Sequence, residues 1–259
     1  MLKLIASDLD GTLLLNNAQE LNPEIYEIVM NIKEKGILFV SASGRQLNSQ
    51  QTLFAPVADK ISYIAENGAF CFHEGEYLFV TPMEENVADS IIDYIETQSC
   101  YKPLISCPST CYIKSGDDEF FSHVKNVMHN DVTTIDDFYA ISEPILKIAL
   151  FIEDTPEENL LALRKLNFPD MKVLRSAKDW FDFVPTSYSK GSALSQLLDL
   201  LNIKPEEVLV FGDQENDIEM FKVAGTSYVM EKGAPKAKEC ATYVTNHVES
   251  TLRKILDTL

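Results

Sequence analysis

Short apolar segments alternate with a helical segment in the first part of the chain. Residues 3–7 (KLIAS) form an apolar run with β character. Apolar side chains at helical spacing over 25–32 then predict a helix, which Asn22 would cap and Gly36 would end. A second β-branched run follows at 37–43 (ILFVSAS). Strand, helix and strand in this order indicate a parallel βαβ unit.

The same alternation of predicted strands and helices returns at the end of the chain. After a third predicted strand at 61–68 and a hairpin at 70–80, it resumes where Ser189 would cap a leucine-rich helix. Residues 206–213 (EEVLVFGD) then read as a buried strand, and the helix after it would end at Gly225. Both ends of the chain are therefore expected to build one α/β, Rossmann-like parallel sheet.

The middle of the chain has a different pattern of apolar and polar residues. Over 82–183 the strands alternate apolar and polar residues, and the helices between them include one with a capping box that begins at Thr155. This pattern favours an open antiparallel sheet covered on one side by helices, an α+β unit. We expect residues 82–183 to form a domain inserted into a core built from 1–81 and 184–259.

Composition and charge narrow the possible partners. The 259 residues are 46% apolar, and 22 basic against 40 acidic side chains give a net charge of −18. A field of this sign repels nucleic acid and anionic membranes, and no apolar run approaches the roughly 20 residues that span a bilayer. Five scattered cysteines indicate reduced thiols, and Cys107 and Cys111 lack the further ligands of a zinc site. We expect a cytoplasmic protein whose partners include neither nucleic acid nor membrane.

Polar side chains follow several of the predicted parallel strands. Asp8, Ser43 and Asp213 each come directly after an apolar run, and Lys190 opens a helix. The carboxyl ends of parallel strands share one edge of a sheet, where ligands bind. These side chains are therefore expected to converge on one site.

The acids of this site need a cation. Asp8, Asp10, Asp213 and Asp217 would repel one another if they crowded together unpaired. Carboxylate and carbonyl oxygens without thiolate or imidazole favour Mg²⁺, which commonly binds substrate phosphate as well. Neighbouring glycines allow the backbone to approach phosphate closely; they are Gly11, Gly44 and Gly212. The sequence thus predicts a site for a magnesium-bound phosphoryl group.

Four segments in fixed order carry a resemblance to a known family. They are DLDGT (8–12), SASGR (41–45), SKGSAL (189–194) and GDQENDIEM (212–220). Together they resemble the motifs of the haloacid dehalogenase superfamily. Their order and spacing are similar to those of Cof-type phosphatases, which carry a large C2-type cap between the second and third motifs. ENGA (66–69) also resembles this subgroup.

The resemblance implies a two-step phosphoryl transfer. Asp8 would be the nucleophile that forms an aspartyl phosphate. Asp10 would protonate the leaving alkoxide and later activate water, and an i+2 spacing at the end of an extended strand would put both carboxylates on one side. Mg²⁺ would take the carboxylates of Asp8 and Asp213 and the backbone carbonyl of Asp10.

The remaining roles are also implied by the resemblance. Asp217 would orient Lys190 or act on the metal directly or through a bound water, although a charge on the helix surface is the alternative. Arg45 would contact substrate or pair with a surface acid, and Thr12 would support its loop. Phosphate oxygens would meet the Leu9 amide, the Ser43 hydroxyl, the Gly44 amide, Lys190 and the Asn216 side chain.

The predicted function is Mg²⁺-dependent hydrolysis of small phosphomonoesters, such as sugar phosphates, through an aspartyl phosphate. A sugar phosphomutase would use the same intermediate and is the nearest alternative. A phospho-accepting regulator, such as a receiver domain, is a third possibility. It is disfavoured because a receiver has about half this length and its phosphorylated aspartate follows a later strand. The physiological substrate and the oligomeric state are not fixed by the sequence.

Overall fold

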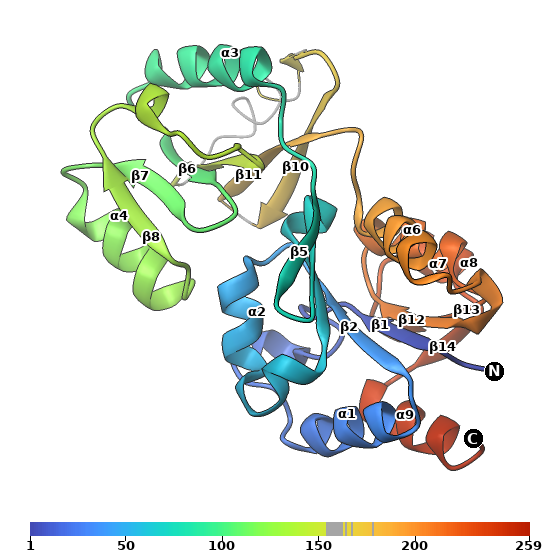
Figure 1. Ribbon diagram of the computed structural model, residues 1–259. Coiled ribbons are helices and arrows are strands. Elements are labelled where there is room, and N and C mark those ends of the chain that lie inside the picture. Colours follow the sequence, from blue (N-terminus) through green and yellow to red (C-terminus); the bar gives the residue numbers. More distant parts are fainter. Residues whose placement is uncertain (154–162, 164, 167, 178) are drawn as a thin grey trace. The chain divides into compact units, whose positions relative to one another are not determined.

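The chain divides into two compact units. The computed structural model (Figure 1) describes residues 1–153, 163, 165–166, 168–177 and 179–259. Met1–Val80 and Tyr188–Leu259 form one unit, here called the core unit, and Thr81–Ser187 form the other, the inserted unit. The helix expected to begin at Thr155 lies outside the described residues.

A twisted sheet of eight strands runs through the core unit in the order β14-β13-β12-β1-β2-β3-β4-β5. The first six strands are parallel, and β4 and β5 pair antiparallel as the predicted hairpin. β1 lies at the centre, between β2 and β12, which come from opposite ends of the chain. The strands are Leu4–Ser7 (β1), Leu38–Ala42 (β2), Ser62–Ala65 (β3), Phe70–His73 (β4), Glu76–Val80 (β5), Val208–Gly212 (β12), Thr226–Met230 (β13) and Tyr243–Thr245 (β14).

Helices cover both faces of this sheet. α6, α7 and α8 pack on one face over Leu4, Val40 and Val210, while α1 and α9 lie on the other (Figure 1). The helices are Glu24–Glu34 (α1), Leu47–Leu53 (α2), Lys190–Leu201 (α6), Ile218–Val223 (α7), Pro235–Cys240 (α8) and Val248–Leu256 (α9). The α/β class with a Rossmann-like parallel core is thereby confirmed.

The helix ends of the core unit agree only in part with the sequence. α1 begins at Glu24 with Pro23 at the N-cap position, one residue later than predicted, although Asn22 Oδ1 accepts a hydrogen bond of 3.1 Å from the Glu24 backbone N–H. Ser189 caps α6 by accepting from the backbone N–H of Ser192, whose own side chain accepts in return from the Ser189 backbone. This reciprocal pair fixes where α6 begins, and so places Lys190 in its first turn.

The inserted unit contains a six-stranded sheet in the order β10-β11-β9-β6-β7-β8. Its strands pair antiparallel, except that β7 and β8 are parallel. The strands are Lys102–Ser106 (β6), Cys111–Lys114 (β7), Val132–Ile135 (β8), Lys147–Phe151 (β9), Met171–Ala177 (β10) and Trp180–Pro185 (β11). Helices α3 (Glu85–Glu96) and α4 (Asp118–Ser122) pack on it.

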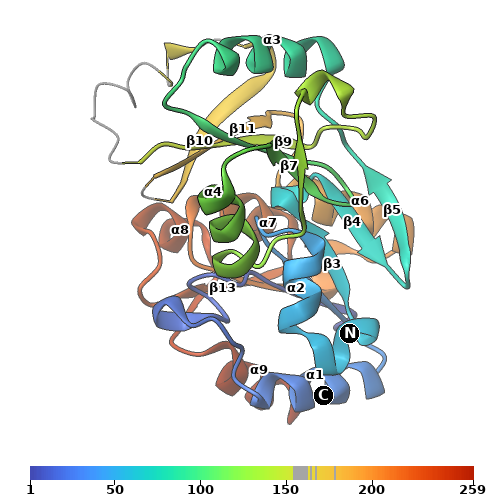
Figure 2. The same cartoon turned by 90° about the vertical axis from the view of Figure 1, so that its left-hand side faces the viewer.

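The sheet of the inserted unit differs from the prediction in being covered on both faces. Ile148 and Leu150 of β9 belong to the apolar cluster that contains α3, whereas Ala149 belongs to the cluster that contains Phe120 of α4. α3 and α4 lie on opposite faces of the sheet (Figure 2). Successive strand residues point to opposite faces, so β9 is apolar on both sides and needs two covers. α4 continues directly into a π-helical segment, His123–Val127, and together they place Phe120 and Val124 on this face at helical spacing. No helix was predicted for this segment from the sequence.

Among the described residues, no helix combines the length and apolar character that crossing a bilayer requires. The cysteines of the chain are all free thiols.

Replacing one leucine of α6 should measure how far the core depends on this helix. Leu197 is fully buried, and we expect Leu197→Ala to lower the free energy of unfolding by about 2–5 kcal/mol because it leaves a cavity. Leu200 lies on the same helix with 52% of its surface exposed, so Leu200→Ala is the matched control and should have little effect. Urea unfolding of both variants provides the measurement, and equal losses would contradict the packing described.

Candidate active site

Four ionisable side chains from distant segments meet at the carboxyl edge of the core sheet. Asp8 directly follows β1 and Asp213 directly follows β12, and the backbone N–H of Asp8 extends the ladder by donating to Phe211 at 3.0 Å. Lys190 begins α6, and Asp217 ends the short helical turn η7 (Glu215–Asp217). The parallel pairing of β1 with β12 therefore brings together acids about two hundred residues apart in sequence.

The ammonium group of Lys190 is the cationic centre of this arrangement. Only 1% of its surface is exposed, and Nζ donates to Asp8 Oδ1 at 2.6 Å and to Asp217 Oδ1 at 2.8 Å. Burial by itself would lower the pKa of Lys190, but the carboxylates of Asp217 and Asp8 raise it above its usual range. Lys190 is therefore a permanent positive charge.

Asp217 uses its second carboxylate oxygen to hold the loop after β12. Oδ2 accepts from the backbone N–H groups of Asp213 at 2.9 Å and Gln214 at 3.0 Å. The side chain is fully buried, which is incompatible with a charge on the helix surface. Asp217 thus accepts three hydrogen bonds, and it connects the Lys190 ammonium to the backbone segment that carries Asp213.

Thr12 and Gly11 complete the contact between the two strand ends. The Thr12 hydroxyl lies 3.3 Å from Asp213 Oδ1 and 3.5 Å from Asp8 Oδ2, and it is buried. Gln214 Nε2 donates to Asp213 Oδ2 at 2.9 Å. A Cβ atom on Gly11 would lie 2.2 Å from Asp213 Oδ2, so only glycine allows Asp213 to approach this closely.

Asp8, Asp213 and Asp217 form what is here called the acid cluster. Each offers a carboxylate oxygen, and these atoms lie within 4.8 Å of one another. Burial raises the pKa of Asp8 well above its ordinary value, and Asp217 and Asp213 add to this rise against the opposing effect of Lys190. Burial also raises the pKa of Asp213. Three buried carboxylates that repel one another offer oxygen ligands, and such a set fits a hard divalent cation such as Mg²⁺.

Asp10 lies apart from the acid cluster. Its carboxylate is 56% exposed and binds the Arg45 guanidinium through two bonds, Nε to Oδ2 at 2.8 Å and the terminal nitrogen to Oδ1 at 2.6 Å. The reason is that β1 ends at Ser7, and the chain then turns so that the Thr12 N–H donates to the Leu9 carbonyl. The strand alternation that would align Asp10 with Asp8 does not extend this far.

Of the two predicted alternatives for Arg45, the structure shows a pair with a surface acid, and that acid is Asp10 of the first motif. The hydrogen bond to Asp10 raises the pKa of the Arg45 guanidinium. Just before it, Ser43 follows β2 and is buried, and its hydroxyl accepts from the backbone N–H of Arg45 at 3.2 Å. Leu9 is fully buried, and its backbone carbonyl accepts from the N–H groups of Thr12 at 3.1 Å and Leu14 at 2.7 Å.

Asn67 is a site residue that reasoning from single motifs did not assign. Its Oδ1 accepts from Asn216 Nδ2 at 3.1 Å, and a Cβ on Gly44 would lie 2.9 Å from its Nδ2. The signal was present in the ENGA segment at 66–69, which resembled the subgroup but carried no chemical role. Gln214, described above, was missed as well.

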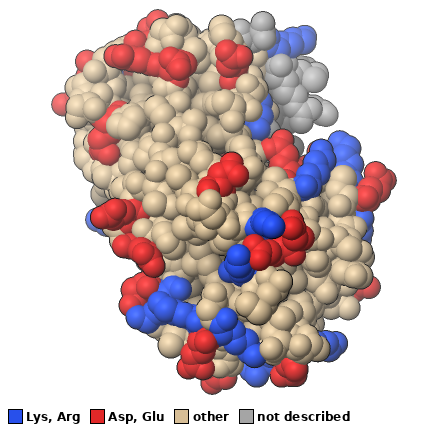
Figure 3. Space-filling view, turned by 45° about the vertical axis from the view of Figure 1, so that its right-hand side comes forward, with Lys and Arg blue, Asp and Glu red and all other residues tan. Residues whose placement is uncertain are grey.

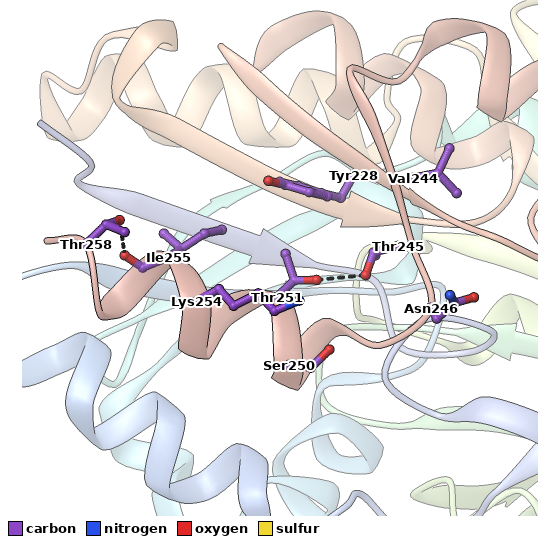
Figure 4. A pocket seen from close by; sticks show the side chains of 9 residues that line it. All are labelled: Tyr228, Val244, Thr245, Asn246, Ser250, Thr251, Lys254, Ile255 and Thr258. Atoms are coloured by element: carbon purple, nitrogen blue, oxygen red, sulfur yellow. Dashed lines mark hydrogen bonds between the residues drawn. The ribbon is translucent and has the colours of Figure 1, made fainter.

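A pocket of about 510 Å³ lies elsewhere in the core unit, beside β14 and α9 (Figure 4). Lys254 is its charged residue, and the hydroxyl oxygens of Thr245 and Thr251 share a hydrogen bond of 2.7 Å. None of its lining residues belongs to the acid cluster. The pocket is therefore separate from the acid cluster.

Comparison with known proteins agrees with this geometry. A family model for haloacid dehalogenase-like hydrolases matches residues 5–251. The chain therefore belongs to the haloacid dehalogenase-like hydrolases, and the predicted enzyme class, a phosphatase of the Cof type, is confirmed.

Two relatives and one solved structure illustrate the similarity. The chain is 27% identical to the 5-amino-6-(5-phospho-D-ribitylamino)uracil phosphatase YbjI of Escherichia coli, over 93% of this chain and 90% of that one. It is 26% identical to YwtE of Bacillus subtilis, a phosphatase of the same name, over 94% and 93%. A crystal structure from Eubacterium rectale is 29% identical with a TM-score of 0.87, and covers 98% of this chain and 99% of its own.

The buried ion pairs of Lys190 should be essential to the fold as well as to the site. Lys190→Met leaves Asp8 and Asp217 buried without their cation, so we expect the free energy of unfolding to fall by about 3–5 kcal/mol in chelator. Lys236→Met is the matched control, because this exposed lysine pairs with Glu215 at the surface and should matter little. Denaturant unfolding compares the two variants. Similar small losses in both would show that the buried pairs are not what holds these segments together.

Proposed function

We propose that this chain hydrolyses small phosphomonoesters with the help of Mg²⁺, through an aspartyl phosphate on Asp8. The observation that carries the proposal is the buried Lys190 ammonium bound to Asp8, next to the carboxylate of Asp213. A structural ion pair needs one acid, whereas this cation is shared by two acids in a cluster of three. Such an excess of negative charge fits a site that takes a cation.

The first step joins Asp8 to the phosphoryl group. A carboxylate oxygen of Asp8 attacks phosphorus, the ester P–O bond breaks, and the departing alkoxide takes a proton from Asp10. In the second step Asp10 accepts a proton from water, whose oxygen attacks phosphorus and releases Asp8 and inorganic phosphate. The Asp10 side chain is 56% exposed, so the alcohol and the water can reach it, and this exchange requires Asp10 to open its bonds to Arg45.

Asp8, Asp213 and the Asp10 carbonyl are proposed to hold the metal. When bound, Mg²⁺ lowers the repulsion between the Asp8 carboxylate and the phosphate dianion. Asp217 is proposed to act on it through water or through Lys190, because its two oxygens already accept three hydrogen bonds.

The phosphate itself is proposed to bind donors along the same edge of the sheet. Lys190 supplies a fixed charge, and the other donors lie in loops that follow β1, β2 and β12. Positioned donors of this kind stabilise the charge that develops on the phosphoryl oxygens. They are the Leu9 amide, the Ser43 hydroxyl, the Gly44 amide and the Asn216 side chain, with Arg45 at the edge.

Small metabolites are the proposed substrates. Figure 3 shows acidic and basic side chains on one face of the described residues, separated by broad uncharged areas. The net charge of −18 disfavours polyanions such as nucleic acid. The two relatives described above are named for a phosphorylated ribitylaminouracil, which is itself a small phosphomonoester. The inserted unit is proposed to act as the cap that selects the leaving group, and the cytoplasm is the proposed location.

Loss of the nucleophile should abolish turnover. We expect Asp8→Asn to release inorganic phosphate from p-nitrophenyl phosphate at least about a thousandfold more slowly than the unchanged protein, because the amide is a poor nucleophile. Asp59→Asn removes an exposed aspartate of the same unit and is the control for loss of one charge. Continuous phosphate release is measured with Mg²⁺ and with chelator. Undiminished release by Asp8→Asn would rule out the proposed mechanism.

Metal binding should be visible without catalysis. Mg²⁺ at about ten times its dissociation constant should stabilise the unchanged protein by about 1.4 kcal/mol, since it binds the folded state alone. Asp213→Asn should remove this gain because it deletes one of the carboxylates, whereas Asp59→Asn should keep it. Thermal unfolding with and without Mg²⁺ gives the comparison. If Asp213→Asn retained the full gain, the metal would have to be placed elsewhere.

A further inference from the structure

The turn over Glu66–Gly68 (η3), here called the 66–68 turn, has an unusual backbone. It directly follows β3, and its three residues have positive φ angles of 50° at Glu66, 59° at Asn67 and 104° at Gly68. Left-handed backbone at a residue other than glycine costs on the order of 1–3 kcal/mol, and it persists where the surroundings fix it. Two such residues in succession therefore call for contacts that hold them in place.

Backbone hydrogen bonds tie the 66–68 turn to the loop after β2. The Asn67 N–H donates to the Ser43 carbonyl at 3.0 Å, and the Glu66 N–H donates to the Arg45 carbonyl at 3.2 Å. The side chain of Asn67 lies against the backbone of Gly44, where any added Cβ would be 2.9 Å from its Nδ2. The turn thus braces the segment proposed to bind phosphate through its hydroxyl and amide.

The same turn reaches two further parts of the site. Asn67 Oδ1 accepts from Asn216 Nδ2 at 3.1 Å. A Cβ on Gly68 would lie 2.1 Å from the Ser189 carbonyl oxygen and 3.0 Å from the Lys190 nitrogen, so Gly68 is in direct contact with the start of α6. The 66–68 turn therefore contacts three segments that supply proposed phosphate donors: the loop after β2, the loop that contains Asn216, and the start of α6.

We propose that Asn67 is a positioning residue for phosphate binding, which acts by fixing the side-chain amide of Asn216. This inference rests on the proposed function. Nδ2 of Asn216 carries two hydrogens, and Asn67 accepts one of them. That bond fixes the rotation of the amide and leaves the second N–H for a phosphate oxygen. The left-handed backbone of Asn67 is what places its Oδ1 beside Asn216.

A plain structural role for Asn67 makes a different prediction. Asparagine tolerates left-handed backbone better than most residues, and this alone could explain its presence. Asn67→Gly separates the two explanations because glycine keeps the backbone conformation and loses the amide. Asn202 is the matched control: it also has a positive φ, 52°, but it caps the far end of α6, about 18 Å along the helix from Lys190.

The test is a double-mutant cycle of Asn67 and Asn216. Binding of inorganic phosphate in the presence of Mg²⁺ is measured by calorimetry for each variant. We expect Asn67→Gly to weaken phosphate binding about tenfold and to lower kcat/KM by a similar factor, whereas Asn202→Gly leaves both unchanged. In a protein that already carries Asn216→Ala, Asn67→Gly should weaken binding less than about twofold, because the partner it positions is gone. All variants are assayed well below their melting temperatures.

Two results would overturn the inference. One is unchanged phosphate binding in Asn67→Gly, and the other is an undiminished tenfold loss when Asn216→Ala is already present. The proposed function fails separately, through absence of phosphate release by the unchanged protein. Coupling between Asn67 and Asn216 without turnover would support the binding role and reject the hydrolase. Turnover without coupling between Asn67 and Asn216 would support the hydrolase and reject the positioning role of Asn67.

Discussion

One buried ammonium group organises the core unit. Lys190 has almost no contact with solvent, so its charge is tolerated only because Asp8 and Asp217 each lie within 3 Å. These acids are reached from β1 and from the loop after β12, and the lysine itself from α6. The ion pairs can therefore form only when the sheet order around β1 and the start of α6 are both correct. The energetics of the fold and the chemistry of the site depend on the same contacts.

The three acids of the cluster differ in how much of their bonding capacity is left. Asp217 accepts three hydrogen bonds, from Lys190 and from two backbone N–H groups, and these bonds fix its carboxylate in place. Asp213 accepts from Gln214, and it shares the Thr12 hydroxyl with Asp8. Asp8 and Asp213 consequently keep oxygen lone pairs that can turn toward a ligand. Identical side chains within one cluster thus acquire different tasks from their hydrogen-bond partners.

The sequence predicted the features of the molecule that depend on local periodicity. The parallel strands, the Ser189 cap and the convergence of Asp8, Asp213 and Lys190 all follow from where apolar runs end. Pairing of Arg45 with a surface acid was one of two predicted alternatives, but Asp10 could not be named as its partner because this pair depends on where β1 stops and the chain turns. The role of Asn67 was missed because it arises only where three distant segments meet. The second helical cover of the inserted sheet comes from α4 and the π-helical segment that continues it, His123–Val127, and it was missed although Phe120 and Val124 lie at helical spacing.

The position of β1 between β2 and β12 has a consequence for synthesis of the chain. The ribosome delivers β1, β2 and β3 early, but the other neighbour of β1 does not exist until Val208–Gly212 have emerged. Until then the central strand has one open edge, which can pair wrongly with any other extended segment. This edge of β1 stays unpaired while the residues between β2 and β12 are synthesised, and the acid cluster cannot assemble before β12 has emerged.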